Sequence, residues 1–366
     1  MALVRANADP TRLLKLIAGG IASATTRSVF AADEDSTLGA DWTPKNLSIS
    51  ATRGGSAETI ALKDRAGNDF SATNPLILKF RNSTVGTGDY TTVSITAALS
   101  ITLSNGSTLG TINNVPARLW LVCFNDAGTP RLGLVNCVSG NSILNLKDDE
   151  VRSSTAEGGA GAADSAQVIY TGTAVSSKPM RVLGYLEYLT STVGVWGTAP
   201  SKIQLFSPGV PLPGSVVQIA GNATGAFASG TTVIPFDNTI PQSGEGDQYL
   251  TQTIVPGSGA NMLRVTSFVQ LYNSAGSAAL IACLFRDSTA DALATAYFLP
   301  QAGGAQSGGD ELTIRHSLLA GAAASTAFKV RAGAHVAGTT SFNGYAAAGI
   351  FGGTCASSIQ IEEIMT

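Results

Sequence analysis

The fold class of this chain is decided by one stretch of sequence, Val93-Ser94-Ile95-Thr96-Ala97-Ala98-Leu99-Ser100-Ile101-Thr102-Leu103. Apolar side chains occupy every second position, and small or hydroxylated side chains lie between them. Successive side chains of a strand point to opposite faces, whereas a helix of about 3.6 residues per turn would mix the two sets. The stretch therefore predicts a half-buried antiparallel strand over residues 93–103.

The same alternation recurs in the second half of the chain, over residues 263–271 and 328–336. Residues 119–124 differ, because they are apolar on both faces. A strand of that kind must be covered on one side by a second sheet and on the other by a neighbouring element or subunit.

Composition agrees with a β-rich protein. The 366 residues are 44% hydrophobic but only 13% charged, and they include 41 glycines, which is typical of short strands and turns. This length exceeds what one hydrophobic core usually supports, so two domains are expected.

A repeat supports tandem domains. The run Gly197 to Leu205 is matched by Gly353 to Ile361, 156 positions later (353 minus 197), with Gly, Thr, Ser, Ile and Gln in register. Residues 121–127 and 282–288 form a second matched pair, each a strand that leads into an Asp turn. The matches are short, so duplication of one β-domain and chance similarity of two β-rich segments are both open.

We therefore expect an all-β protein of two tandem antiparallel β-sandwich or jelly-roll domains. The first domain is predicted over residues 41–206 and the second over 227–366, joined by a Pro/Gly-rich linker at 207–226. An arm, residues 1–40, precedes them.

The arm is the one place where a helix is predicted. Asp9-Pro10-Thr11 offers a cap and a first-turn proline, followed by an apolar stripe from Leu13 to Ile21. A secretion signal that ends near Ala22 is the alternative, which Lys15 disfavours because it interrupts the apolar stretch. A membrane span needs about 20 apolar residues, so we expect no membrane insertion and interpret the arm as an anchor that docks into another protein.

Catalytic candidates are weak. His316 shares a strand face with Leu312 and Ile314, which favours a core or interface position, and His335 is expected to be solvated. Asp148-Asp149-Glu150 is expected to be a solvated turn rather than a cation site. Glu362 and Glu363 are adjacent on a strand, so they point to opposite faces and cannot flank one glycosidic bond.

Binding motifs are equally weak. Gly158-Gly159-Ala160-Gly161 lacks the Gly-Lys-Ser/Thr of a phosphate-binding loop. Tyr185, Tyr188 and Trp196 could stack on sugars, but core or interface packing is favoured. A net charge of −3 without a basic stripe argues against nucleic-acid binding. We expect no enzyme activity, cofactor or metal, and the receptor-binding residues stay unknown.

The four cysteines show no spacing typical of a metal site. They are Cys123, Cys137, Cys283 and Cys355, and most lie in or beside predicted strands. We expect them to be free and to pack as small apolar side chains, although Cys123 and Cys137 could be neighbours across a hairpin.

Several segments resemble a family of tailed-bacteriophage virion proteins of the fibre, spike or decoration type. They are residues 181–187, 199–211, 232–242, 246–249, 284–294 and 351–364. The resemblance spans about residues 76–366 and leaves the arm unmatched. It implies knob-like jelly rolls packed around a threefold axis, and it carries over no catalytic residue.

Together these observations predict a homotrimeric, tail-associated virion fibre or spike that is assembled in the host cytoplasm. Its arm, residues 1–40, would bind other virion proteins, and its distal domain would contact a host-surface polysaccharide or protein. A head fibre or capsid decoration protein is the main alternative, and a polysaccharide-degrading spike is the second. The role of residues 147–166 is not assigned.

Overall fold

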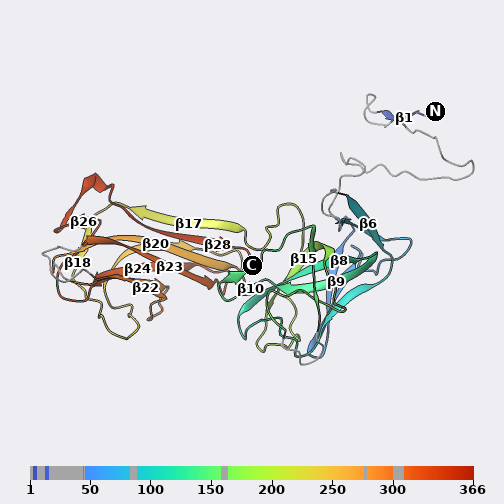
Figure 1. The fold of residues 1–366 in the computed structure, drawn as a ribbon, viewed down its shortest axis with the longest axis horizontal. Helices are drawn as coiled ribbons and strands as arrows, with labels where there is room; N and C mark the ends of the chain where they lie inside the picture. The colour runs from blue at the N-terminus through green and yellow to red at the C-terminus, as the bar shows by residue number, and fades with distance from the viewer. Residues whose placement is uncertain are drawn as a thin grey trace, which may run out of the picture. The chain divides into compact units, whose positions relative to one another are not determined.

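The computed structural model describes residues 3–5, 13–15, 44, 46–82, 89–157, 164–275, 278–299 and 309–366. The chain divides into two units, Met1–Trp42 and Thr43–Thr366. Within the described ranges the regular elements are β-strands, apart from one 3-10 turn at Phe351–Gly353 (Figure 1). The prediction of an all-β sandwich protein is confirmed.

In the first unit, β1 (Leu3–Arg5) pairs antiparallel with β2 (Leu13–Lys15), and Val4 lies opposite Leu14. The predicted helix is therefore wrong at Leu13–Lys15, because a neighbouring strand supplies the backbone hydrogen-bond partners. The remaining residues of the helix prediction lie outside the described residues.

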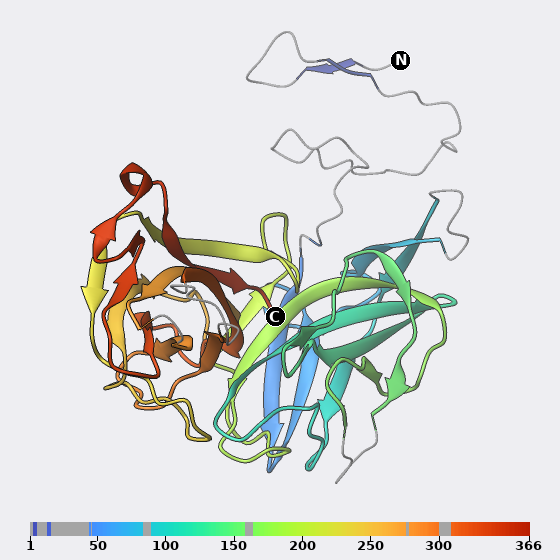
Figure 2. The same cartoon turned by 60° about the vertical axis from the view of Figure 1, so that its left-hand side comes forward.

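The first sandwich of the second unit packs one large sheet against two small ones (Figures 1 and 2). The large sheet has the order β12 (Glu150–Arg152), β15 (Lys178–Leu189), β8 (Pro116–Asp126), β9 (Thr129–Asn136), β14 (Tyr170–Thr171) and β13 (Thr155–Ala156), with β16 (Lys202–Leu205) on β15. The small sheets are β3 (Ser48–Gly54), β4 (Ala57–Lys63) and β7 (Leu99–Leu103), and the pair β5 (Leu76–Arg81) with β6 (Tyr90–Ile95). A short hairpin, β10 (Val138–Ser139) and β11 (Ser142–Ile143), follows β9.

Strand β8 is buried on both faces. Leu119 and Leu121 belong to the core shared with β3 to β7, whereas Trp120 and Val122 belong to a second apolar cluster on the other face. That second cluster is completed by loop residues of the same chain, including Leu146, Val175, Leu212 and Met365. Coverage on both sides is confirmed, and the chain itself provides it.

The stretch predicted as one strand, residues 93–103, forms parts of two strands. Strand β6 ends at Ile95 and pairs with β5, and β7 begins at Leu99 and pairs with β4. The alternation still describes burial, since Val93, Ile95, Ile101 and Leu103 are buried. The prediction of a continuous strand is wrong because Thr96 to Ala98 carry the chain from one small sheet to the other.

The second sandwich packs two sheets together. One contains β17 (Val216–Thr224), β28 (Ser357–Ile364), β20 (Met262–Asn273), β25 (Thr340–Phe342) and β18 (Ala228–Gly230), with β23 (Gly309–Leu319) on β20. The other contains β19 (Asp247–Ile254), β24 (Thr326–Ala334), β21 (Leu280–Arg286) and β22 (Ala294–Phe298). A small hairpin is formed by β26 (Gly344–Tyr345) and β27 (Ala348–Gly349).

The core of this sandwich follows the predicted periodicity. Leu263, Val265 and Val269 on β20 are fully buried, as are Phe328 and Val330 on β24. Strand β17, however, occupies residues that we had placed in the linker at 207–226, and it pairs with β28 along nearly its whole length. The second sandwich therefore begins before residue 227.

The proposed duplication holds for one hairpin only. In the first sandwich Cys123 on β8 lies opposite Leu132 on β9, and in the second Leu293 donates a backbone hydrogen bond of 2.7 Å to Leu284. The repeated closing strands differ: β16 joins the sheet that contains β8, whereas β28 lies in the sheet opposite β21. Similar sequence therefore occupies different positions in the two sandwiches.

Candidate functional site

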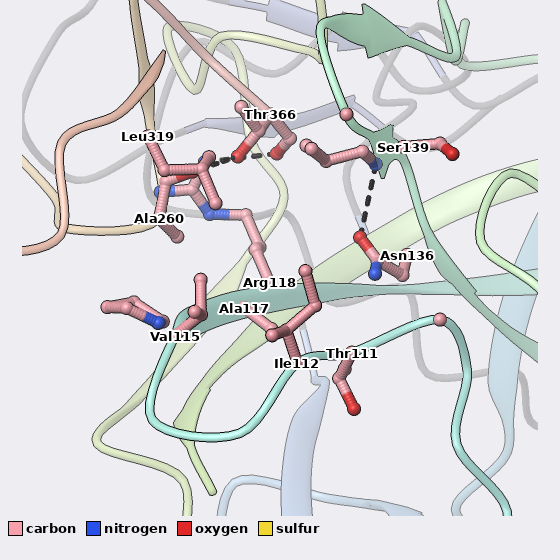
Figure 3. A pocket seen from close by; sticks show the side chains of 14 residues that line it. Thr111, Ile112, Val115, Ala117, Arg118, Asn136, Ser139, Ala260, Leu319 and Thr366 are labelled. Carbon is pink, nitrogen blue, oxygen red and sulfur yellow. Dashed lines mark hydrogen bonds between the residues drawn. The ribbon is translucent and has the colours of Figure 1, made fainter. Parts of the chain in front are cut away.

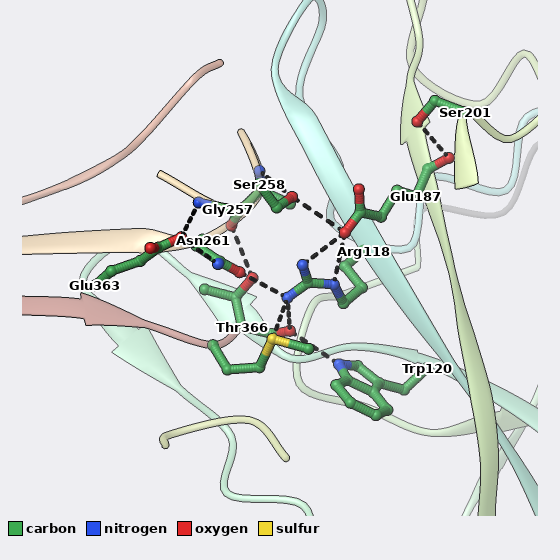
Figure 4. Close-up of polar contacts among 11 residues, drawn as sticks. Arg118, Trp120, Glu187, Ser201, Gly257, Ser258, Asn261, Glu363 and Thr366 are labelled. Atoms are coloured by element: carbon green, nitrogen blue, oxygen red, sulfur yellow. Dashed lines mark hydrogen bonds and ion pairs between the residues drawn. The ribbon is translucent and has the colours of Figure 1, made fainter. Parts of the chain in front are cut away.

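A buried polar network is centred on Arg118, near the start of β8 (Figure 4). Arg118 lies directly opposite Glu187 in the pairing of β8 with β15. Its Nε and Nη2 atoms donate hydrogen bonds of 3.1 and 2.6 Å to Glu187 Oε1. The Arg118 side chain is 2% exposed, so the ion pair is removed from solvent.

The remaining donor of the guanidinium reaches the second sandwich. Arg118 Nη1 donates to Asn261 Oδ1 at 2.8 Å and to the carbonyl oxygen of Thr366 at 3.0 Å. The indole Nε1 of Trp120 donates to the same carbonyl oxygen at 2.9 Å. Figure 4 shows Arg118 and Trp120 of β8 reaching Thr366, with Glu187 of β15 on the other side of the guanidinium.

Residues of the second sandwich complete the network. Asn261 Nδ2 donates to Glu363 Oε1 at 2.5 Å, and the backbone N–H of Gly257 donates to the same oxygen at 2.8 Å. Ser258 Oγ donates to Glu187 Oε1 at 3.0 Å. The backbones of Gly214 and Ser215 also exchange hydrogen bonds of 2.9 Å with Met365. We call this set of contacts the joint, since it ties the two sandwiches together.

Electrostatics explain why the joint holds together. Burying a charge away from water is unfavourable unless the charge is paired and hydrogen-bonded. Removing one partner of a buried ion pair destabilises a protein by about 3–5 kcal/mol. The Arg118 cation is paired with Glu187 and bonded to two further oxygens, and its Cζ lies 4.6 Å from the centre of the Tyr185 ring. The geometry therefore favours a fixed contact between the sandwiches.

A cavity of about 200 Å³ lies beside the joint (Figure 3). Its walls include Thr111, Ile112, Asn136, Ala260 and Leu319 from both sandwiches. Sites for small organic ligands usually measure about 300–1,000 Å³, so this cavity is smaller than a typical substrate pocket.

The two histidines lie in different parts of the second sandwich, His316 on β23 and His335 directly after β24. His316 is half-buried on β23, opposite Val265, and burial lowers its pKa. His335 was expected to be solvated, but it is half-buried: its Nδ1 accepts a hydrogen bond of 2.8 Å from the backbone of Ala279, and its ring lies 5.9 Å from that of Phe236. The expectation for His335 is wrong because Ala279, just before β21, is hydrogen-bonded to it.

The acidic run 148–150 is part of the framework of the first sandwich. Asp148 accepts hydrogen bonds of 2.9 Å from both Nε and Nη2 of Arg181 and one of 2.8 Å from the backbone of Val182. Asp149 accepts from the backbone of Arg81 at 2.8 Å. The prediction of a purely solvated turn is wrong, since these carboxylates fasten the loop to β5 and β15.

The other sequence candidates are structural in position. Glu362 is partly exposed and paired with Arg264, whereas Glu363 is 1% exposed, so the two point to opposite faces as expected. Tyr185, Tyr188 and Trp196 are buried. Gly158 to Gly161 lie outside the described residues.

The cysteines are free, and three of them are buried. Cys123 and Cys137 belong to apolar clusters on opposite faces of the large sheet, so they are not hairpin neighbours. Over the ranges that the structure describes, no group of three or more His, Cys, Asp or Glu residues is arranged to hold a metal ion. No helix among those residues is long and apolar enough to span a membrane.

A second polar site lies on the outer face of the second sandwich. It is a surface groove of about 420 Å³ lined by Asn141, Arg264, Thr266, Arg315, His316 and Ser317. Sequence analysis missed both this groove and the joint, because their residues come from strands far apart in the chain and no local motif marks them.

Comparison with known proteins finds only weak structural similarity. No protein-family model matches the chain, and no curated protein matches its sequence. The Eiger TNF of S. frugiperda is 12% identical with a TM-score of 0.26, covering 40% of this chain and 92% of that one. The VP2 subviral particle of infectious bursal disease virus is 12% identical with a TM-score of 0.23, covering 89% of this chain and 78% of that one.

An insecticidal delta-endotoxin of Bacillus thuringiensis, Cry8Ea1, is 7% identical with a TM-score of 0.23, covering 87% of this chain and 52% of that one. These three proteins have different biological roles, and the TM-scores are too low for any of those roles to be transferred. The functional argument therefore rests on the chain itself.

Proposed function

We propose that this chain is a structural subunit of a bacteriophage virion, a homotrimeric tail-associated fibre or spike that mediates attachment to the host surface. The observation that carries the proposal is the joint: its buried Arg118 links two β-sandwiches in series through Glu187, Asn261 and Thr366. A projecting fibre needs modules that keep a fixed relative geometry under load. A buried arginine that is paired and hydrogen-bonded to both sandwiches holds them in one arrangement.

The carboxylates of the joint are suited to a structural role. Glu187 Oε1 accepts from Arg118 and from Ser258, and Glu363 Oε1 accepts from Asn261 and from Gly257. A glycosidase acid needs a proton to give and a base needs a free lone pair, so oxygens engaged in this way suit neither step. We propose that the chain is not an enzyme. Incubation of the purified protein with host capsule or lipopolysaccharide should leave chain length unchanged, and shortening would favour a degrading spike.

We propose a trimer because of the exposed edge strand β17, and no longer because of the doubly apolar strand β8. The doubly apolar strand β8 is covered by its own chain, so it no longer argues for symmetry mates. Instead, edge strand β17 carries Val216, Val217 and Ile219, which are 47%, 37% and 62% exposed. An edge strand that exposes several apolar side chains together offers a template for pairing with another chain.

The oligomeric state is measurable on the purified protein. Light scattering should give three times the subunit mass of 37.2 kDa. The variant Ile219→Lys should lower that mass, whereas Ile77→Lys, at a comparably exposed position (55%) on β5 of the first sandwich, should not. A monomeric mass for the unmodified chain would contradict the proposal.

The arm, residues 1–40, is proposed to dock into other virion proteins. It belongs to a unit of its own, Met1–Trp42, and it carries Arg5, Arg12 and Lys15 among apolar residues. Removal of the arm should leave the fold of residues 43–366 intact and abolish incorporation into particles.

Position on the particle is tested by labelling intact virions with antibody against this protein. Signal at the tail is expected. Signal over the capsid would reject the tail assignment and support the head fibre or capsid decoration protein, which uses the same β-modules.

A further inference from the structure

The groove on the outer face of the second sandwich brings two arginines together. In the pairing of β20 with β23, Arg264 lies opposite Ser317 and Thr266 lies opposite Arg315. Arg264 and Arg315 are therefore diagonal neighbours on one face of the sheet, at about 7–8 Å by the usual geometry of such pairs. Asn141, in the turn of the β10–β11 hairpin, closes the groove from the first sandwich.

Hydrogen-bonding capacity in this groove is mostly unused. Among the described residues, the side chains of Arg315, Thr266, Ser317 and Asn141 make no hydrogen bond or ion pair within the chain. Arg264 has one partner, Glu362, at 3.3 Å, and both side chains are partly exposed (51% and 26%). An ion pair of that kind contributes little, about 0–1 kcal/mol.

The charge balance favours an anion. Two arginines face one carboxylate, that of Glu362, which also accepts a hydrogen bond of 3.3 Å from Gln360. One arginine charge is thus left without compensation. An arginine fork binds carboxylate and phosphate oxygens through two parallel hydrogen bonds, which makes these anions the best match for Arg315.

The neutral side chains of the groove indicate which kind of molecule bears the anionic group. Hydroxyl and amide groups such as those of Thr266, Ser317 and Asn141 both donate and accept, which suits the hydroxyl groups of a sugar. The volume of about 420 Å³ is that of a small-ligand site, in contrast to the smaller cavity beside the joint.

We propose that this groove binds an acidic saccharide, a sugar unit that bears a carboxylate or a phosphate group. Arg315 holds the anionic group, Arg264 supports it, and the neutral side chains bind neighbouring hydroxyl groups. The inference deepens the proposed attachment function and rests on it for the biological source of the sugar. Several copies of the groove in one oligomer would convert weak single contacts into firm adhesion.

The test is a calorimetric titration of the full chain at low salt with three probes: a hyaluronan tetrasaccharide, which carries carboxylates, inorganic phosphate, and neutral maltotetraose. We expect at least one anionic probe to bind, with affinity that falls as salt is added, and maltotetraose not to bind. Binding of the tetrasaccharide assigns a carboxylate and binding of phosphate assigns a phosphate group.

Variants locate the binding. Arg315→Ala and Arg315→Gln should weaken it about tenfold or more, since a charge-assisted hydrogen bond is lost. The matched control is Arg65→Ala, in the turn between β4 and β5, which removes another exposed arginine side chain that makes no hydrogen bond or ion pair among the described residues. The backbone N–H of Arg65 donates to Asn46 Oδ1 at 3.3 Å, and alanine keeps that bond. Unfolding temperatures should be the same for all variants, because these side chains are on the surface.

Equal binding of maltotetraose, unchanged affinity in both Arg315 variants, or no binding of either anion at millimolar concentration would each overturn the inference. The titration involves no particles, so its outcome is independent of the labelling result. Binding without tail labelling would reject only the tail assignment, and tail labelling without binding would reject only the groove.

Discussion

Arg118 and Thr366 lie 248 positions apart in the chain, yet the guanidinium Nη1 donates a hydrogen bond of 3.0 Å to the carbonyl oxygen of Thr366. This contact joins β8 of one sandwich to the residues that directly follow β28 of the other. Glu187 neutralises the same guanidinium. The free energy lost by burying these charges is offset only when the ion pair and its hydrogen bonds are all formed.

Replacing Arg118 should therefore be severe. Arg118→Ala leaves Glu187 buried without its cation, and we expect a loss of about 3–5 kcal/mol in the free energy of unfolding. Urea unfolding followed by tryptophan fluorescence measures it. The control is Arg131→Ala, which removes an ion pair with Asp126 whose side chains are 31% and 25% exposed and should cost about 1 kcal/mol or less. Equal losses in the two variants would contradict the importance of the joint.

Gly184 should not tolerate a side chain. It lies at a register shift in β15, and a Cβ there would overlap the carbonyl oxygen of Gln204 on β16. Gly184→Ala should lower the free energy of unfolding by about 1–3 kcal/mol, because the two strands must separate to make room. Gly172→Ala, where no atom would meet the added Cβ, should be neutral within about 1 kcal/mol. If both variants unfold alike, the close approach of β16 is in error.

The cysteines should differ sharply in reactivity. Burial raises the pKa of Cys123 and of Cys137 to about 12 and that of Cys283 to about 11, so their thiolates are scarce at neutral pH and shielded from reagents. Only Cys355, which is partly exposed, should react with iodoacetamide in the folded protein, as read by mass spectrometry of peptides. Cys355→Ser should abolish labelling until the protein is unfolded; residual labelling in this variant would argue against the burial of the others.

Glu58 should make stability depend on pH. Burial raises its pKa above the ordinary 4.5, opposed by the hydrogen bond of 2.6 Å from Tyr188 and by the charge of Arg53, and its Oε1 has no hydrogen-bond partner. The unfolded chain then releases the Glu58 proton before the folded one does. The contribution of Glu58 to stability is therefore intact below pH 4.5 and falls as pH rises through the raised folded pKa.

Glu58→Gln should remove that decrease, because the amide has no proton to release in this range. Tyr188→Phe should steepen it, since the carboxylate loses the donor that stabilises its charge. Urea unfolding at a series of pH values between 4.5 and neutrality provides the comparison. Parallel profiles for all three proteins would show that Glu58 does not titrate differently in the folded state.

Much of the β-structure could be foreseen from local patterns. Alternation over residues 263–271 located β20 and its buried face, and adjacency alone placed Glu362 and Glu363 on opposite faces. The apolar run at 119–124 correctly indicated a strand covered on both sides. Local patterns failed at residues 93–103, where the sequence alternation runs through an exposed corner at residues 96–98 and the hydrogen-bond partners change from β5 to β4.

Strand period and composition were thus sufficient for the all-β class and for the buried face of strands such as β20, since both depend on neighbours within a few residues. The tertiary structure decided which residues cover β8 and which sheet contains β28. It also decided the contact of Arg118 with Thr366 and the proximity of Arg264 to Arg315, because these depend on how strands pair and sheets pack. Those contacts join residues far apart in the chain, and a hydrogen bond between them forms only after both strands have been placed by their cores.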